Sequence, residues 1–328
     1  MAPRNGAHVK RKTVVVKVGT ASVTKEKSPN AYVELDLDTI NSIAEGIAEL
    51  HAQGYGVVLV SSGAVAAGMA KCKVKVRERK KIARENDLLS LRHYAEIGQP
   101  ILFQRYSEAL EGHGIMLAQS LTERNAYHDM EHRKDIRDLR KLDLKRGIVV
   151  HVNGNDATTK AELHIGDNDF TAVHEAVLIG AGHLVFLTDM PGILLPDPRN
   201  PEGERKLQEV IDFVSPELIS NLGQGSRLGT GGPGTKIVLC DLARRSGINP
   251  VIAGKDEAKR LVDLVEGRAD GTRFPIIGKT SLTPEIACDV LDQIAKHGTA
   301  LNIDDYFHDL SSIALDRMAA REAKSAVR

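Results

Sequence analysis

Short oxygen-bearing side chains crowd one stretch of the sequence, VNGNDATTKAELHIGDNDF at positions 152–170. Its acidic and amide side chains are Asn153, Asn155, Asp156, Glu162, Asp167, Asn168 and Asp169. Three roles are open to such a set, because Asn and Asp favour turns, carboxylates bind divalent cations, and both groups hydrogen-bond polar ligands. The EF-hand role is excluded, since a loop starting at Asp167 would need Gly and Glu where the chain has Ala172 and Leu178. We predict no metal-ligating residues.

A lysine near the end of a strongly apolar run is a second candidate for chemistry. The run TVVVKVGT is typical of a buried parallel strand, and Lys17 lies near its carboxyl end. A buried ammonium group needs an anionic partner, because burying it alone is costly. The alternative is a lysine at the strand edge whose ammonium group reaches water.

Two glycine-containing segments could bind ligands through backbone N–H groups. SSGAVAAG at 61–68 follows a predicted strand and begins a predicted helix, so it is either a ligand cradle or a site of tight helix–strand packing. LGTGGPGTK at 228–236 places glycines and threonines before a lysine at a helix start, which indicates a phosphate loop. It does not satisfy the Walker pattern, because Thr235 separates Gly234 from Lys236.

Thr188 and Asp189 end another predicted strand, in the segment FLTDMPGIL. Asp189 either contacts a ribose or caps the next turn.

The candidates together are two lysines, a glycine–threonine loop and acidic residues at strand ends. Phosphoryl transfer needs this inventory, because cations and N–H groups stabilise the charge on the transferred group. The absence of GxSxG disfavours a serine hydrolase, and the absence of GxGxxG after the first strand disfavours a dehydrogenase.

Alternating strands and helices must position these residues. Apolar runs that end in polar or glycine-containing turns predict strands at about 13–20, 56–64, 113–121, 146–156, 183–194 and 249–254. Apolar residues at spacings of three and four, Ile40, Ile43, Ile47 and Leu50, predict a helix behind possible caps Asp36 and Asp38 that ends before Gly54. Further helices are predicted at about 170–181, at 236–247 and, near the end, at 284–298 and 309–326. A further hairpin strand is possible at 158–165. Open α/β sheets bind ligands at the carboxyl ends of their strands, where most of the polar clusters lie.

Bulk composition narrows the class of protein. The chain has 44 basic and 44 acidic residues, so it lacks the overall basic field of a nucleic-acid-binding protein. We interpret the basic run at 71–84 as a solvated helix or loop face. Three widely spaced cysteines argue against disulfides or a zinc cluster, and the sequence lacks an apolar run long enough to span a membrane. We therefore expect a cytoplasmic protein without nucleic-acid or membrane partners.

At these residues the sequence resembles the amino acid kinase family, and within it the enzymes that phosphorylate glutamate in proline synthesis. The resemblance spans about residues 12–275 and rests on an ordered set of motifs: VVVKVGT, VSSGAVAAG, IGQP, VNGND, GDND, LTDMPGIL and GTGGPGTK. It implies an α/β fold, a three-layer αβα sandwich with a mostly parallel central sheet, over residues 1–275. Residues 276–328 are expected to form a helical tail without a PUA domain, and a homo-oligomer (dimer or tetramer) is expected.

The resemblance also implies ATP and Mg²⁺ as cofactors, a small carboxylate such as L-glutamate as acceptor, and a role for each matching residue. The implied catalytic residues are Lys17, Asp169 and Lys236, with Asp169 organising the two lysines. The implied acceptor-binding residues are Ser62, Gly63, Asn155, Asp156 and Asn168. The implied ATP-binding residues are Lys17, Gly19, Thr188, Asp189, Thr230, Gly231, Gly232, Pro233, Gly234, Thr235 and Lys236.

One departure from the family pattern leaves the acceptor open. Relatives usually read Asn-Glu-Asn-Asp where this chain reads NGND, so Gly154 replaces a glutamate. A related kinase that acts on another small carboxylate or phosphate is therefore the second hypothesis. A non-catalytic nucleotide or amino acid sensor is the third, and the joint presence of Lys17, Asp169 and Lys236 argues against it.

Overall fold

The β-branched runs of the sequence form a seven-stranded sheet in the computed structural model, which describes residues 13–158, 167–197, 200–220, 222, 232–277, 282–297 and 306. The strand order is β11-β10-β7-β1-β4-β6-β5. The strands are β1 (Thr13–Val18), β4 (Gly56–Ser61), β5 (Leu117–Thr122), β6 (Val149–Gly154), β7 (His183–Thr188), β10 (Asn249–Gly254) and β11 (Thr272–Arg273). Neighbours from β10 to β5 pair in parallel, and β11 pairs antiparallel with β10. The predicted mostly parallel sheet is confirmed.

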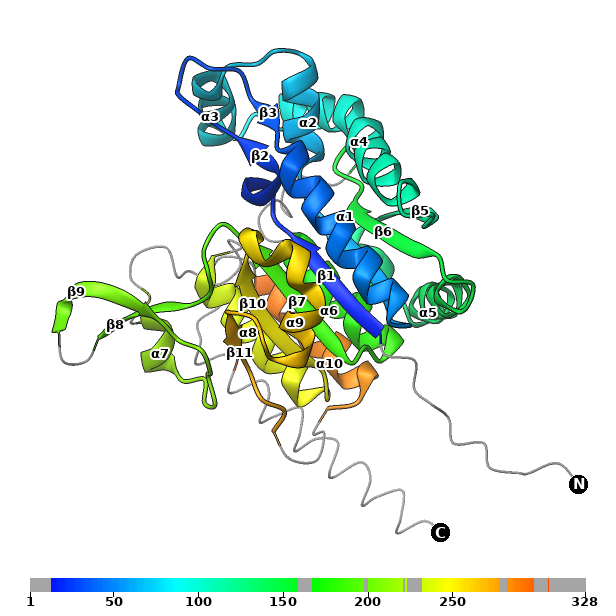
Figure 1. Ribbon diagram of the computed structural model, residues 1–328, viewed down its shortest axis with the longest axis vertical. Helices are drawn as coiled ribbons and strands as arrows, with labels where there is room; N and C mark the ends of the chain where they lie inside the picture. Colours follow the sequence, from blue (N-terminus) through cyan, green and yellow to red (C-terminus); the bar gives the residue numbers. More distant parts are fainter. Residues whose placement is uncertain are drawn as a thin grey trace, which may run out of the picture.

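Helices cover both faces of this sheet, which gives the predicted three layers (Figure 1). One face carries α1 (Leu37–Ala52), α4 (Leu88–Glu111) and α9 (Leu261–Glu266). The other carries α5 (Met130–Lys145), α6 (Asp167–Ile179), α8 (Pro233–Arg245) and α10 (Pro284–His297). The remaining helices are α2 (Ala64–Lys71), α3 (Val76–Glu85) and α7 (Pro216–Ser220). Two small strand pairs are β2 (Thr24–Lys25) with β3 (Glu34–Leu35), and β8 (Leu194–Asp197) with β9 (Asn200–Leu207).

Side chains alternate between the two faces along β1, and this alternation decides where Lys17 points. Val14, Val16 and Val18 belong to the apolar cluster that includes α1, whereas Val15 belongs to the cluster that includes α6 and α8. Lys17 occupies the next position after Val15 on the same face. The strand therefore presents this lysine to the first turns of α6 and α8.

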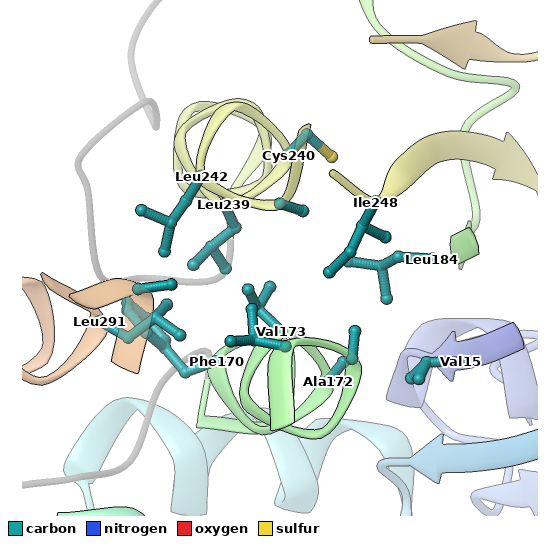
Figure 2. Close-up of a cluster of buried hydrophobic side chains, with 14 of the residues drawn as sticks. Val15, Phe170, Ala172, Val173, Leu184, Leu239, Cys240, Leu242, Ile248 and Leu291 are labelled. Atoms are coloured by element: carbon teal, nitrogen blue, oxygen red, sulfur yellow. The ribbon is translucent and has the colours of Figure 1, made fainter. Parts of the chain in front are cut away.

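The core on the α6 face includes a helix from the predicted C-terminal tail. Figure 2 shows apolar side chains of α6, α8 and α10 converging, among them Phe170, Leu239 and Leu291. Asp292 on α10 also pairs with Arg133 of α5, with Oδ2 and Nη2 at 2.7 Å. α10 therefore packs as part of the main core, and the boundary between domain and tail at 275 stays a prediction.

Several predicted boundaries shift in the structure. α6 begins at Asp167, so the acidic residues that suggested a loop form its first turn, and β5 begins only at Leu117, after Gly114 with φ 71°. The basic run at 71–84 ends α2 and forms most of α3, where the Lys80 and Lys81 side chains are 67% and 65% exposed. That run is a solvated helix face, as predicted. The possible strand at 158–165, apart from Thr158, and the predicted helix at 309–326 lie outside the described residues.

Cys72, Cys240 and Cys288 are free, and the last two are buried. In the part of the chain that the structure describes, the helices are too short or too polar to cross a membrane.

Glu175 of α6 and Arg140 of α5 form an ion pair that is removed from solvent. Arg140 Nε and Nη2 donate to Glu175 Oε2 and Oε1 at 2.9 and 3.0 Å, and the two side chains are 2% and 0% exposed. The Tyr127 hydroxyl donates to the same carboxylate at 2.9 Å. Glu175→Gln leaves the guanidinium buried without a countercharge, so we expect the free energy of unfolding to fall by about 3–5 kcal/mol.

Chemical denaturation measures this loss, and α5 offers a matched control. Asp138 pairs with Arg137 at the surface, where the two side chains are 53% and 36% exposed. Because exposed ion pairs contribute little, Asp138→Asn should change the free energy of unfolding by less than about 1 kcal/mol. Equal losses in the two variants would contradict the expected role of the buried pair.

Candidate active site

Lys17, Asp169 and Lys236 meet at the carboxyl end of β1, and we call them the lysine–aspartate triad. Asp169 lies in the first turn of α6 and Lys236 in that of α8. Lys17 Nζ is 2.5 Å from Asp169 Oδ1, and Lys236 Nζ is 3.0 Å from Asp169 Oδ2. The side chains of Lys17, Asp169 and Lys236 are 8%, 1% and 15% exposed. The anionic partner that Lys17 was predicted to need is therefore Asp169.

The triad carries excess positive charge, because two ammonium groups share one carboxylate. Desolvation lowers the pKa of Lys17; Asp169 opposes this shift, and the Lys236 ammonium adds to it. Burial alone would raise the pKa of Asp169, but the two lysines outweigh it and hold that pKa below its ordinary value of 3.8. An anionic phosphoryl group placed beside the two ammonium groups would balance the excess charge.

The first turn of α8 adds backbone N–H groups on the same side of the triad. Gly232 caps the helix with extended backbone (φ −71°, ψ 179°), and Pro233 occupies the first turn, where its missing N–H is not needed. Gly234 and Thr235 follow and are buried. The positive end of the helix dipole therefore points toward the lysines. Two predicted loop residues lie outside the described residues: Thr230 and Gly231.

Gly19 follows β1 and borders the Lys17 ammonium group. A Cβ atom at Gly19 would lie 3.8 Å from Lys17 Nζ. Because glycine has no such atom, the backbone leaves that side of the ammonium group open to a ligand.

A cluster of amide and hydroxyl groups lies beside the triad, and Asn168 is at its centre. Asn168 Nδ2 is 2.9 Å from Asn153 Oδ1, 3.0 Å from Ser62 Oγ and 3.1 Å from Ser61 O. Asn168 Oδ1 accepts from the backbone N–H of Gly154 at 3.2 Å. This amide cluster thus ties the carboxyl ends of β4 and β6 to the first turn of α6.

The two serines at the end of β4 have different surroundings. Ser61 Oγ is 2.6 Å from His151 Nε2 in the core, whereas Ser62 Oγ accepts from Asn168. Burial lowers the pKa of His151 to about 4, so this imidazole is neutral near pH 7. Gly63 then takes φ 118°, a conformation that strains any side chain. Ser62 and Gly63 therefore border the amide cluster, and the Ser61 side chain belongs to the core.

Asn155 and Asp156 follow β6 at the same edge of the sheet and are half-buried. The backbone N–H of Asn155 donates to Thr122 O at 3.1 Å, which ties this turn to the end of β5. A Cβ atom at Gly154 would lie 3.3 Å from Asp156 Oδ1 and 3.7 Å from Asn168 Oδ1. A side chain at position 154 would thus press against Asp156 and lie beside Asn168.

Thr188 and Asp189 lie at the carboxyl end of β7, the strand beside β1. Thr188 Oγ1 accepts from the Met190 N–H at 3.1 Å and donates to Met190 O at 2.8 Å. Asp189 is exposed. The turn after β7 is therefore closed by Thr188, and the role of Asp189, in capping or in contact with a ribose, stays a prediction.

Two polar residues of the amide cluster were not among the implied acceptor-binding residues, although Asn153 belongs to the polar stretch 152–170. Asn153 is fully buried near the end of β6, and its Nδ2 donates to Gln99 Oε1 at 2.8 Å. The sequence did point to Asn153, because a polar side chain at the end of a buried strand needs a hydrogen-bond partner. Gln99 lies 54 positions away, within the motif IGQP, and no local pattern pointed to it.

Among the described residues, no group of three or more His, Cys, Asp and Glu side chains is placed to hold a metal ion. The Asp169 carboxylate is engaged by the two lysines of the triad.

The edge of the sheet offers two chemically different parts, a cationic triad suited to phosphate and an amide cluster suited to a small polar molecule. They adjoin because Asn168 and Asp169 are neighbours in α6.

The sequence matches the amino acid kinase family over residues 12–254. It is 35% identical to a glutamate 5-kinase of Vibrio vulnificus (strain YJ016) over 265 residues, 80% of this chain and 66% of that protein. It is 34% identical to glutamate 5-kinase 2 of Bacillus subtilis (strain 168) over 273 residues, 83% of this chain and 70% of that protein. The chain thus spans about two thirds of the length of these relatives.

Solved structures share the architecture at low sequence identity. Carbamate kinase from Giardia lamblia bound to AMP-PNP is 17% identical with a TM-score of 0.53, over 82% of this chain and 99% of that chain. UMP kinase from Ureaplasma parvum is 17% identical with a TM-score of 0.51, over 81% and 99%. These structural similarities show that the chain has the same fold as the two kinases.

Proposed function

The chain belongs to the amino acid kinase family, and we propose that it transfers the γ-phosphoryl group of ATP to the side-chain carboxylate of L-glutamate in proline synthesis. The observation that carries this proposal is the lysine–aspartate triad, in which Asp169 holds two ammonium groups at one point. The adjoining amide cluster suits an amino acid. The relatives in Vibrio vulnificus and Bacillus subtilis, both glutamate 5-kinases by name, support the choice of acceptor.

The proposed reaction matches the charges of the triad. An oxygen of the acceptor carboxylate forms a bond to the γ-phosphorus, the bond to the β–γ bridging oxygen breaks, and its electron pair leaves with ADP. Lys17 and Lys236 stabilise the negative charge on the transferred group, and Asp169 keeps both ammonium groups in place. The acceptor carboxylate is already ionised near neutral pH, so no general base is required.

We expect ATP to bind together with Mg²⁺. Since the Asp169 carboxylate is engaged by the triad, the phosphate oxygens and water would supply most ligands of the cation. Mg²⁺ held there would neutralise part of the phosphate charge. The first turn of α8, from Gly232 to Lys236, would contact the same phosphates.

The acceptor is proposed to lie against the amide cluster. Ser62 and Gly63 would offer donors to its carboxylates, Asn168 would hold the Ser62 hydroxyl group beside them, and Asn155 and Asp156 would contact its α-amino end. This arrangement keeps the reacting carboxylate close to the triad, because Asn168 directly precedes Asp169 in α6. A homo-oligomeric assembly and a cytoplasmic location stay predictions.

A second acceptor is favoured by one feature, the glycine at position 154. Glycine supplies no carboxylate at this position, where a side chain would start beside Asp156 and Asn168. The site therefore has one anionic group fewer to recognise the ammonium group of an amino acid. A related kinase acting on a different small carboxylate is therefore the alternative proposal.

A substrate panel separates these proposals. ADP release should be measured with L-glutamate, D-glutamate, aspartate and N-acetylglutamate, each with ATP and Mg²⁺, and with and without proline. We expect the highest kcat/KM with L-glutamate. Turnover of another acid without L-glutamate turnover would favour the alternative. Nucleotide binding with no ADP release from any acid would contradict both proposals and favour a sensor.

A further inference from the structure

Gln99 lies where α4 comes into backbone contact with α2. A Cβ atom at Gly98 would lie 1.8 Å from Ala64 O, and one at Gly68 would lie 1.9 Å from Tyr94 O. The two helices can approach this closely only because both positions are glycine. Since α2 starts directly after β4, the contact brings the residue after Gly98 to the carboxyl ends of β4 and β6.

The Gln99 side chain completes the hydrogen bonds of the Asn153 amide. Asn153 Nδ2 donates to Gln99 Oε1 at 2.8 Å, while Asn153 Oδ1 accepts from Asn168 Nδ2 at 2.9 Å and from the Gly154 N–H at 2.8 Å. If the Asn153 amide were rotated by half a turn, its NH₂ group would face the Asn168 NH₂ group and its oxygen would face Gln99 Oε1. The acceptor on Gln99, together with the donors on Gly154 and Asn168, therefore favours the rotamer that supports Asn168.

Asn168 in turn connects this chain of amides to the proposed acceptor site. Its Nδ2 group reaches Ser62 Oγ at 3.0 Å, and Asp169 of the triad follows it in α6. Asn153 is fully buried, so an Nδ2 group that lost Gln99 would have no water to replace it. Loss of the Gln99 acceptor would thus disturb Asn168 by way of Asn153.

We propose that Gln99 is a positioning residue for the acceptor acid, which acts by fixing Asn153 and, through it, Asn168. This inference rests on the proposed function, because it concerns the acceptor side of the same reaction. Gln99 Nε2 is buried and donates to no acceptor among the described residues, so the side chain contributes through its carbonyl oxygen. Glutamate at this position keeps an oxygen acceptor of the same reach, whereas methionine keeps the length and removes the acceptor.

Steady-state kinetics of Gln99→Met and Gln99→Glu test the proposal. We expect Gln99→Met to raise KM for L-glutamate about tenfold, in line with the loss of one buried hydrogen bond, and to leave KM for ATP unchanged. Gln99→Glu should recover most of this loss. Gln104→Met is the matched control on α4, because Gln104 is exposed and bonds only Glu108 among the described residues at 2.7 Å.

The outcomes separate this inference from the proposed function. If wild type turns over L-glutamate and Gln99→Met has the same KM, or raises both KM values equally, the positioning role is overturned. If wild type turns over no acid, the proposed function fails, and crystal structures of the two variants then decide. The inference expects the Asn153 amide to leave Asn168 in Gln99→Met and to stay in Gln99→Glu; an unmoved Asn153 in both variants overturns it.

Discussion

Lys236→Ala is expected to lower kcat by roughly 10²–10³-fold and to leave the protein folded. The variant removes one of the two ammonium groups that are proposed to face the transferred phosphoryl group. Asp169 keeps Lys17 as a partner at 2.5 Å, so no buried charge is left alone. The Lys236 side chain is also 15% exposed, which limits the loss of packing.

ADP release under saturating substrates measures the change in kcat, and circular dichroism checks the fold. Lys259→Ala is a suitable control, because the Lys259 side chain is 58% exposed and pairs with Glu45 at the surface. The control should keep wild-type turnover. Full activity in folded Lys236→Ala would remove this lysine from the proposed mechanism.

Asp169→Asn should reduce both stability and turnover, and its effect on stability should exceed that of Lys236→Ala. The Asp169 side chain is 1% exposed and is the carboxylate that joins the two lysines. Its neutralisation leaves two ammonium groups close together with no countercharge between them. We expect the free energy of unfolding to fall by about 3–5 kcal/mol, as for other broken buried ion pairs.

The pH dependence of that loss identifies its electrostatic origin. The pKa of Asp169 lies below its ordinary value of 3.8, so the stability that its carboxylate contributes is fully present above that value. This contribution is lost as the pH falls through the lower pKa of the folded state. Urea denaturation should therefore show that wild type and Asp169→Asn differ in their free energy of unfolding by a constant amount above about pH 5. Below about pH 4 this difference should shrink. If the difference in free energy of unfolding stayed the same at acidic pH, the loss would come from a packing defect instead.

Most of the fold follows from local patterns in the sequence. The runs that become β1 and β4 are apolar at nearly every position, which is what burial on both faces of a parallel sheet requires. Asp36 was a predicted cap of α1, and its carboxylate accepts from the Thr39 N–H at 3.2 Å. The start of α6 was misplaced because Asp167, Asn168 and Asp169 favour turns, although acidic residues also stabilise the first turn of a helix.

The site could be predicted from the sequence where one residue type requires a particular partner. A lysine in a buried strand requires an anion, and the structure supplies Asp169. The hydrogen bonds of the amide cluster could not be predicted from the sequence, because they join three elements that lie far apart in the chain. Gln99 joins it only because Gly98 lets α4 approach α2, a consequence of tertiary packing.

In the proposed reaction, a carboxylate oxygen of L-glutamate attacks the γ-phosphorus of ATP in the site formed by the triad. L-Glutamate labelled with ¹⁸O in its γ-carboxylate tests this claim, with hydroxylamine present to cleave the acyl phosphate at its carbonyl carbon. The released phosphate should carry one ¹⁸O atom, and γ-glutamyl hydroxamate should form in step with ADP. Unlabelled phosphate released together with ADP would show transfer to water and would contradict the proposed reaction.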